Sequence, residues 1–208
     1  MIARRDLVLM LGALTTSGGA ALGGCAGLLP SVNEPIPLYT LSAVTQFTQS
    51  LPKVDWQLVV GTPIASADLD TTRIALTREP GVVEYFAKGA WADNAPVLLQ
   101  TKLIESFEAS GGIVAVGRDA SGLRPDYVLQ SELRDFQAEF DGGDVPTAHL
   151  RLAAKLVRMP DRRIVTTLTI EQRVPAAGAS LNQIVDAFDR AAGEAFEQVV
   201  IKVLTAQP

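Results

Sequence analysis

Apolar and polar residues alternate along much of the chain after residue 37, and this period of two predicts β-strands. The alternation is strongest at 149–158, where the apolar residues share one side of the expected strand. Glu79-Pro80-Gly81 predicts a tight turn, so the runs on either side of it form a hairpin. The expected strands are 38–41, 56–60, 72–77, 82–87, 113–116, 127–140, 149–158 and 164–174.

A period near 3.6 residues replaces the alternation in two segments and predicts two helices. The first follows the capping pair Asp93-Asn94 and ends at Gly111-Gly112. The second begins at Ser180, where Gln183 completes a capping box, and its apolar residues recur at helical spacing almost to the end of the chain. The pattern predicts an α+β fold, similar to an α/β sandwich: two main helices, including the long C-terminal one, pack on a mostly antiparallel mixed β-sheet.

Length and composition agree with a single folded domain over residues 38–208. Hydrophobic residues make up 48% of the 208 and charged residues 20%, which excludes a disordered chain. The formal net charge of −5, without a basic stripe, argues against a nucleic-acid partner. The chain has one cysteine, so an internal disulfide is impossible and the fold must depend on its hydrophobic core.

The first 24 residues have the layout of a bacterial signal peptide. Arg4 and Arg5 supply the positive start, and the apolar run from Leu7 to Leu14 follows. That run is shorter than the roughly 20 residues that a membrane-spanning helix needs. We therefore expect residues 1–24 to direct export; the paired arginines leave the general and the twin-arginine routes both open.

Cys25 is the expected site of lipid attachment. Leu22-Gly23-Gly24-Cys25 resembles the lipobox of bacterial lipoproteins, which implies cleavage between Gly24 and Cys25, a diacylglycerol on the thiol and an acyl chain on the new N-terminus. The alternative is an ordinary signal peptide with a chance cysteine, but the single cysteine of the chain stands where lipidation requires it. Two or more acyl chains are enough for stable anchoring.

Residues 25–37 then form the lipidated N-terminus and a flexible tether. Three prolines and no periodic pattern occur in it, and residues 26–37 reach at most about 40 Å. In enteric bacteria an aspartate directly after the lipidated cysteine signals retention in the inner membrane. This chain has Ala26 at that position, which favours the outer membrane.

Candidate catalytic and metal-binding residues are few. His149, the single histidine, lies in the alternating strand on the side opposite Leu150, where we expect it to face solvent. Asp135, Glu139, Asp141 and Asp144 surround a Gly-Gly turn without calcium-loop spacing, and a solvated hairpin tip is the preferred interpretation. We therefore expect no enzyme activity, no metal and no cofactor apart from the lipid on Cys25.

Two arginines outside that strand are candidate ligands for a lipid headgroup. Arg73 and Arg78 could hold an anionic headgroup, although pairing with carboxylates is the preferred role.

The mature chain also resembles the ABC-type transport auxiliary lipoproteins, which include the lipoprotein of the paraquat-inducible system. The resemblance rests on LYTL at 38–41, on the segments 69–111, 126–140 and 154–165, and on Ala187-Phe188-Asp189 in the terminal helix. Trp91, Arg73 and Tyr127 match family positions and are interpreted as fold determinants. The family carries no catalytic residue over to this chain.

The resemblance implies a non-enzymatic accessory subunit of a transport system with an MCE (mammalian cell entry) domain protein, a permease and an ATPase. Such a subunit would dock the MCE protein at the periplasmic face of the outer membrane and support phospholipid or hydrophobic-molecule transport; a homo-oligomer is allowed. The alternatives are a stand-alone periplasmic lipid-binding lipoprotein and, less favoured, an envelope hydrolase that uses a carboxylate.

Overall fold

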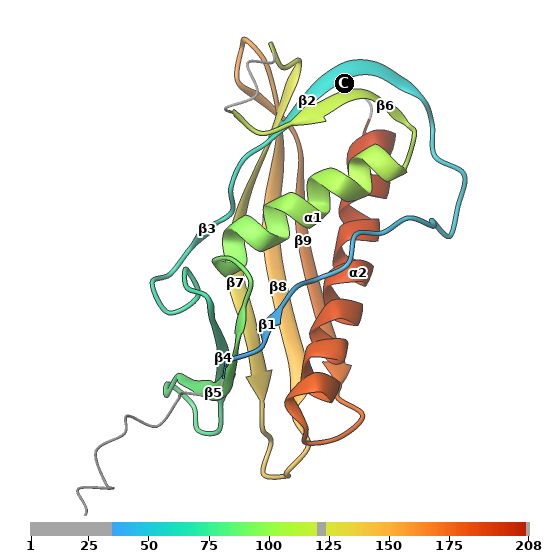
Figure 1. The fold of residues 1–208 in the computed structure, drawn as a ribbon. Coiled ribbons are helices and arrows are strands. Elements are labelled where there is room, and N and C mark those ends of the chain that lie inside the picture. The colour runs from blue at the N-terminus through green and yellow to red at the C-terminus, as the bar shows by residue number, and fades with distance from the viewer. Residues whose placement is uncertain (1–34, 120–123, 207–208) are drawn as a thin grey trace, which may run out of the picture. The chain divides into compact units, whose positions relative to one another are not determined.

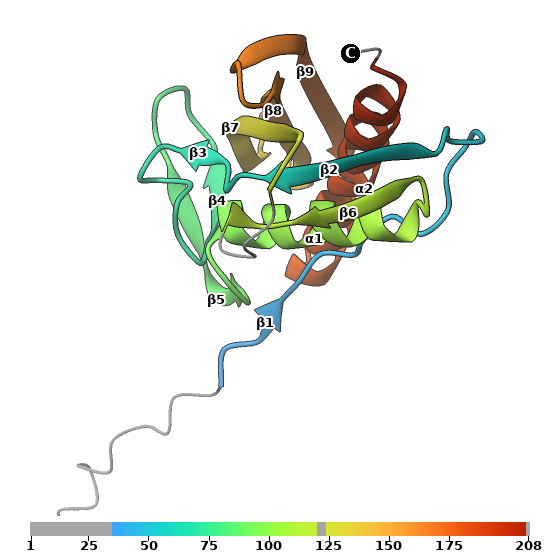
Figure 2. The same cartoon turned by 90° about the horizontal axis from the view of Figure 1, so that it is seen from above.

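The structure, a computed structural model, describes residues 35–119 and 124–206. Within these residues, nine strands form one mixed sheet, and two helices cover one side of its long strands (Figures 1 and 2). The elements are β1 (Leu38–Tyr39), β2 (Val54–Val60), β3 (Ile64–Ala65), β4 (Arg73–Thr77), β5 (Glu84–Trp91), α1 (Ala95–Ala109), β6 (Ile113–Gly117), β7 (Tyr127–Glu139), β8 (Thr147–Arg158), β9 (Arg163–Pro175) and α2 (Leu181–Thr205).

The long strand β7 organises the sheet. One edge of β7 pairs with β8 along its whole length, and β8 pairs in the same way with β9, so these three strands form an antiparallel meander. The other edge of β7 receives three short strands in turn, β2, β3 and β4, all parallel to it. β6 extends the sheet beyond β2, while β5 and β1 extend it beyond β4. The predicted α+β class and mixed sheet are therefore confirmed.

Most predicted strands lie where the alternation placed them, and the differences are local. β5 begins at Glu84 and continues to Trp91, whereas 82–87 was predicted; Val82 and Val83 belong to the turn that Gly81, with a φ of 79°, opens. The two-residue strand β3 was not predicted, because its pairing with β7 at Glu132 and Leu133 comes from tertiary contact. Short runs carry too little periodicity to show such pairings.

Both helices begin as predicted. α1 starts after Asn94 with a proline in its first turn, although the Asn94 side chain makes no cap hydrogen bond. α2 starts after Ser180, and the reciprocal capping box with Gln183 is present. Gln100 is a buried polar residue of α1 whose Nε2 donates to the carbonyl of Val60 at 2.8 Å, which ties this helix to the end of β2.

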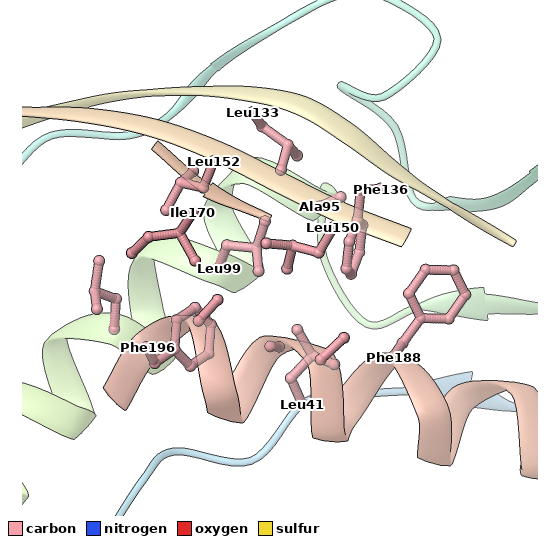
Figure 3. Packing of buried hydrophobic residues seen from close by; sticks show 14 of the residues in the cluster. Leu41, Ala95, Leu99, Leu133, Phe136, Leu150, Leu152, Ile170, Phe188 and Phe196 are labelled. Atoms are coloured by element: carbon pink, nitrogen blue, oxygen red, sulfur yellow. The ribbon is translucent and has the colours of Figure 1, made fainter. Parts of the chain in front are cut away.

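The core fills the space between the helices and the meander. Phe136 and Leu150 from the strands point toward Phe188 and Phe196 of α2 (Figure 3). Phe188 is fully buried, and its ring centroid lies 4.9 Å from that of Phe136 and 5.5 Å from that of Trp91. Edge-to-face aromatic contacts of this kind add to the free energy gained from burying apolar area.

The segment after β1 crosses the outer side of the helices and is fixed by their side chains. The backbone N–H of Ser42 donates to Asp189 of α2 at 2.6 Å, and that of Val44 donates to the Ser106 hydroxyl of α1 at 2.9 Å. Leu41, directly before Ser42, is buried in the core (Figure 3). These contacts satisfy backbone donors that no strand pairs.

Candidate docking face of the sheet

The side of the meander that faces away from the helices is its outer face, and the registers of β7, β8 and β9 define it row by row. Gln137, His149 and Arg173 form one row across the three strands, and Asp135, Arg151 and Glu171 form the next. Leu150 and its alternating neighbours point to the helix side. The alternation in the sequence thus assigns each residue to the correct side of the sheet.

His149 lies at the centre of an ion cluster on this face. Its Nδ1 is 2.7 Å from Glu139 Oε1, and its Nε2 is 3.0 Å from Glu171 Oε1. Arg173 joins the two carboxylates, with 2.5 Å to Glu139 and 3.2 Å to Glu171. Carboxylates only accept hydrogen bonds, and the Nη2 of Arg173 also lies 3.3 Å from Nδ1, so both ring nitrogens of His149 lie among polar partners.

The expectation that His149 faces solvent was therefore wrong, although the side of the strand was right. Only 4% of the residue is exposed. The carboxylates come from Glu139 on one flanking strand and Glu171 on the other, and together with Arg173 they cover the imidazole. The sequence does contain a signal for this cluster. The alternation in the three predicted strands 127–140, 149–158 and 164–174 places Glu139, His149, Glu171 and Arg173 on one side of adjacent strands.

The charges of the cluster alter the pKa of both carboxylates. Burial acts to raise the pKa of Glu139, but hydrogen bonds from His149 and Arg173 outweigh it and hold that pKa below its ordinary value of 4.5. The hydrogen bond from Arg173 is the main cause that lowers the pKa of Glu171, which lies at the surface. Both groups are therefore stabilised as anions, which suits a structural ion pair better than a proton-transfer group.

The carboxylates around the Gly-Gly turn separate into two kinds. Glu139 belongs to the ion cluster, and Asp135 is paired with Arg151, so neither lies in a solvated hairpin tip as predicted. Asp141 and Asp144 are exposed in the β7–β8 turn, as that interpretation expected. The strand runs on to Glu139, so the first two carboxylates lie within the sheet and the last two beyond it.

The other half of the outer face is a shallow groove with a floor of small side chains. Its volume is about 440 Å³, and Ala153, Thr167 and Thr169 lie along it. Ile64 of β3 stands at its rim with 75% of the residue exposed. A second hollow of about 300 Å³ adjoins the same isoleucine, and the ion pair of Glu132 with Arg134 at 3.0 Å lies along both.

The two candidate headgroup ligands, Arg73 and Arg78, lie at opposite ends of β4. Arg73 covers the ring of Tyr85 at 3.6 Å. Arg78 covers the ring of Phe140 at 4.1 Å and approaches Glu84 at 3.5 Å, so it has the carboxylate contact that the sequence favoured. Stacking on aromatic faces adds a second role that the sequence pattern did not indicate.

Trp91 and Tyr127 lie in the core. Trp91 is 1% exposed and stacks on Phe136 at 5.3 Å, while the ring of Tyr127 meets that of Trp56 at 4.8 Å. Their burial supports the interpretation of both residues as fold determinants.

The signal peptide 1–24, the cleavage site at Gly24 and Cys25, and the tether up to residue 34 lie outside the described residues. Among residues 35–119 and 124–206, no group of His, Cys, Asp or Glu side chains is arranged to hold a metal ion. In the same part of the chain, neither helix is both long and apolar enough to cross a membrane. The outer face thus combines paired charges with a shallow groove in which small side chains lie beside Glu132, Arg134 and Lys155, a mixture that suits recognition of a partner surface.

Comparison with solved structures finds the same fold elsewhere. The crystal structure of protein XCC0632 from Xanthomonas campestris superimposes with a TM-score of 0.77 at 29% identity, over 81% of this chain and 95% of that one. The hypothetical protein CT253 from Chlamydia trachomatis has a TM-score of 0.50 at 9% identity, over 74% of this chain and 98% of its own. The second likeness concerns the fold alone.

Comparison of sequences places the chain in a family. An uncharacterized protein, bll6063, of Bradyrhizobium diazoefficiens is 30% identical over 151 residues, which are 70% of this chain and 40% of that protein. The chain thus spans about two fifths of the length of this relative. The sequence pattern described as "ABC-type transport auxiliary lipoprotein component" matches residues 39–200, which include both helices up to the last turns of α2 and the whole sheet from Tyr39 on. The chain belongs to the family of ABC-type transport auxiliary lipoprotein components.

Proposed function

We propose that this lipoprotein is a non-enzymatic accessory subunit of an MCE-type ABC transport system. Cys25 carries a diacylglycerol and an acyl chain that anchor it to the periplasmic face of the outer membrane. The folded domain docks the MCE-domain protein, which works with a permease and an ATPase in moving phospholipids or other hydrophobic molecules between the membranes. The family match over residues 39–200 is the observation that carries this proposal.

The outer face of the meander is the surface that we assign to the MCE-domain partner. In this face Asp135 pairs with Arg151 of the neighbouring strand, and Glu139 of β7 pairs with Arg173 of β9 across β8, which helps to hold the three strands in one register. The groove has small side chains, Ala153, Thr167 and Thr169, that a partner segment can approach closely, and the charged Glu132, Arg134 and Lys155 beside them can bind its polar groups. A face that combines small side chains with charged and polar ones has a composition typical of non-obligate protein interfaces.

Packing between the layers weighs against the alternative of a stand-alone lipid carrier. Such a carrier needs an apolar cavity, and the space between helix and sheet is occupied by Phe107, Phe136, Phe188 and Phe196, none more than 1% exposed. The paired state of the carboxylates likewise weighs against a hydrolase, which needs a carboxylate free to exchange a proton with substrate.

Photocrosslinking in living cells tests the docking proposal. A photoreactive amino acid replaces Thr169 in the groove, and the matched control replaces Gln198, which is exposed on α2. We expect the MCE-domain protein of the same cell to be captured from position 169 and not from position 198. Mass spectrometry identifies the captured protein.

The outcomes separate the surface from the partner. Capture of the MCE-domain protein only from position 198 would overturn the assignment of the outer face and leave the partner in place. Recovery of no transport component from either position, with a lipoprotein that is membrane-bound in the same cells, would overturn the docking function.

A further inference from the structure

Three connections meet at one end of the sheet. They are the β4–β5 turn at 78–83, the β7–β8 turn at 140–146 and the β9–α2 loop at 176–180. The N–H of Phe140 donates to the carbonyl of Thr77 at 2.9 Å, which joins the first two, and the N–H of Ala176 donates to the carbonyl of Pro146 at 2.9 Å, which joins the second and third. Figure 1 shows the three together at the lower end of the molecule.

Exposed apolar side chains occur on all three connections. Val82, Val83 and Val145 are 45%, 41% and 50% exposed, and the loop before α2 adds the exposed Ala177 and Ala179. We call this surface, defined by these five residues, the valine end. The β8–β9 turn at the other end of the meander has the exposed charged residues Asp161 and Arg162, and the exposed Arg163 and Ile164 follow at the start of β9. Exposed valines thus occur on two connections at one end of the meander, whereas the β8–β9 turn has none.

The direction in which the chain enters the domain points to the valine end. β1 runs parallel to β5, with Leu38 opposite Ala90, and the N–H of Ala90 donates to the carbonyl of Pro37 at 3.2 Å. Because the two strands are parallel, Pro37 lies on the side of β1 that faces the Glu84 end of β5, and the β4–β5 turn comes just before Glu84. Ile36 and Leu38 on this path are 57% and 68% exposed, so apolar surface continues along the entry.

The distance along the chain from the expected lipid anchor is short. Pro35, the first described residue, comes ten residues after Cys25, a reach of at most about 35 Å. The stretch of β5 between Ala90 and Glu84 is about 20 Å long at strand spacing. A membrane that holds Cys25 is therefore within reach of the valine end.

From these observations we infer that the valine end rests on the phospholipid surface that holds the anchor. This inference depends on the lipid at Cys25 in the proposed function and adds an orientation: the valines of two adjacent turns contact the headgroup region, and the β8–β9 turn points away from that membrane. Exposed apolar residues grouped beside a membrane anchor lower the free energy of the domain when they leave water. The long strands then stand upright on the membrane.

The charges at the valine end indicate the kind of lipid surface. Glu79 and Asp141 lie along a cleft of about 320 Å³ between the first two turns, together with Arg78. Asp144 is exposed beside Val145. Acidic groups are repelled by anionic headgroups, whereas a zwitterionic headgroup offers an ammonium to the carboxylates and a phosphate to the guanidinium. A zwitterionic surface therefore fits this end.

Fluorescence quenching on the full mature lipoprotein in vesicles tests the orientation. The diacylglycerol blocks the Cys25 thiol, so single cysteines from Val83→Cys and Val145→Cys are labelled selectively with an environment-sensitive dye. The matched control is Ile164→Cys, a 52% exposed apolar residue next to Arg163. The vesicles contain phosphatidylethanolamine and phosphatidylcholine with a nitroxide on a fraction of the headgroups, and a second set replaces a third of the lipid with phosphatidylglycerol.

We expect the nitroxide to quench the dye at positions 83 and 145 at least twofold more than at position 164, and the phosphatidylglycerol to reduce that difference. Equal quenching at the three positions in protein that floats with the vesicles would overturn the orientation while leaving the anchor and the docking function intact. Greater quenching at position 164 would reverse the orientation. Failure of the mature protein to float would overturn the anchor and, with it, this inference.

Discussion

His149 and Glu139 face each other across two antiparallel strands, with Nδ1 2.7 Å from Oε1, on the side of the sheet that the helices leave open. Glu171 reaches the other ring nitrogen from β9 at 3.0 Å, so one imidazole links three strands. Arg173 closes the group through both carboxylates. A charged cluster of this kind on the outer face braces the meander that we assign to partner docking.

Replacing His149 should destabilise the sheet. In His149→Gln one amide nitrogen replaces two ring nitrogens that face different carboxylates, so it cannot donate to both, and Glu139, whose side chain is 18% exposed, loses a partner. We expect the free energy of unfolding to fall by about 1–3 kcal/mol. Urea unfolding of the unlipidated Cys25→Ala chain measures it, with Lys155→Gln, exposed on the same strand, as the control. Equal stability of the two variants would show that the cluster contributes nothing.

Acid should weaken the fold through Glu139. Its folded pKa lies below 4.5, so the unfolded chain binds the proton more readily. The stabilisation is therefore complete above the unfolded pKa and is lost as the pH falls through the folded pKa. Urea unfolding between about pH 6 and pH 3 should show a smaller loss of free energy for Glu139→Gln than for the wild type.

Glu171→Gln serves as the comparison for that pH series. The pKa of Glu171 is also lowered, but its side chain is 46% exposed, and solvent screens its ion pairs. We expect this substitution to change the pH dependence less than Glu139→Gln does. The reverse order would mean that burial does not decide the strength of these contacts.

Truncating Phe188 should cost the most among single changes in α2. The ring is fully buried and touches both Trp91 and Phe136, so Phe188→Ala removes two aromatic contacts and leaves a cavity. We expect a loss of about 3–5 kcal/mol in the free energy of unfolding. Phe188→Leu keeps most of the volume and should lose clearly less. Comparable losses for both would mean that the aromatic contacts, rather than the volume, dominate.

Removing the thiol of Cys25 should release the protein from the membrane. Cys25→Ala, secreted behind an ordinary cleavable leader in place of residues 1–24, leaves no site for the diacylglycerol, so we expect the chain to move from the membrane fraction to the soluble periplasm, without incorporation of labelled fatty acid. Ser31→Ala, in the tether, is the control and should remain in the membrane fraction. Fractionation of inner and outer membranes in the wild type checks the assignment to the outer membrane. A membrane-bound Cys25→Ala variant would show that another feature anchors the protein.

Much of the fold could be predicted from local pattern. Period-two alternation located the three long strands, and the Ser180–Gln183 capping box located the start of α2 to the residue. Such signals depend on neighbours within a few positions, so they survive in any tertiary context. The short strand β3 and the extension of β5 to Trp91 were missed because their pairing partners lie far away in the sequence.

The candidate site divides in the same way. The sequence by itself determined which residues of β8 face away from the core, and it singled out Cys25 as the residue with the clearest chemistry, since lipidation depends on a short linear motif. Only the tertiary structure decided that His149 is buried, because its partners Glu139 and Glu171 come from two other strands, 10 and 22 residues away. Likewise, only the fold brings Val82 and Val145, from two different connections, to the same end of the sheet. The burial of a residue such as His149, and the grouping of residues from different turns on one surface, depend on contacts between segments far apart in the sequence. The local alternation of apolar and polar residues cannot predict such contacts.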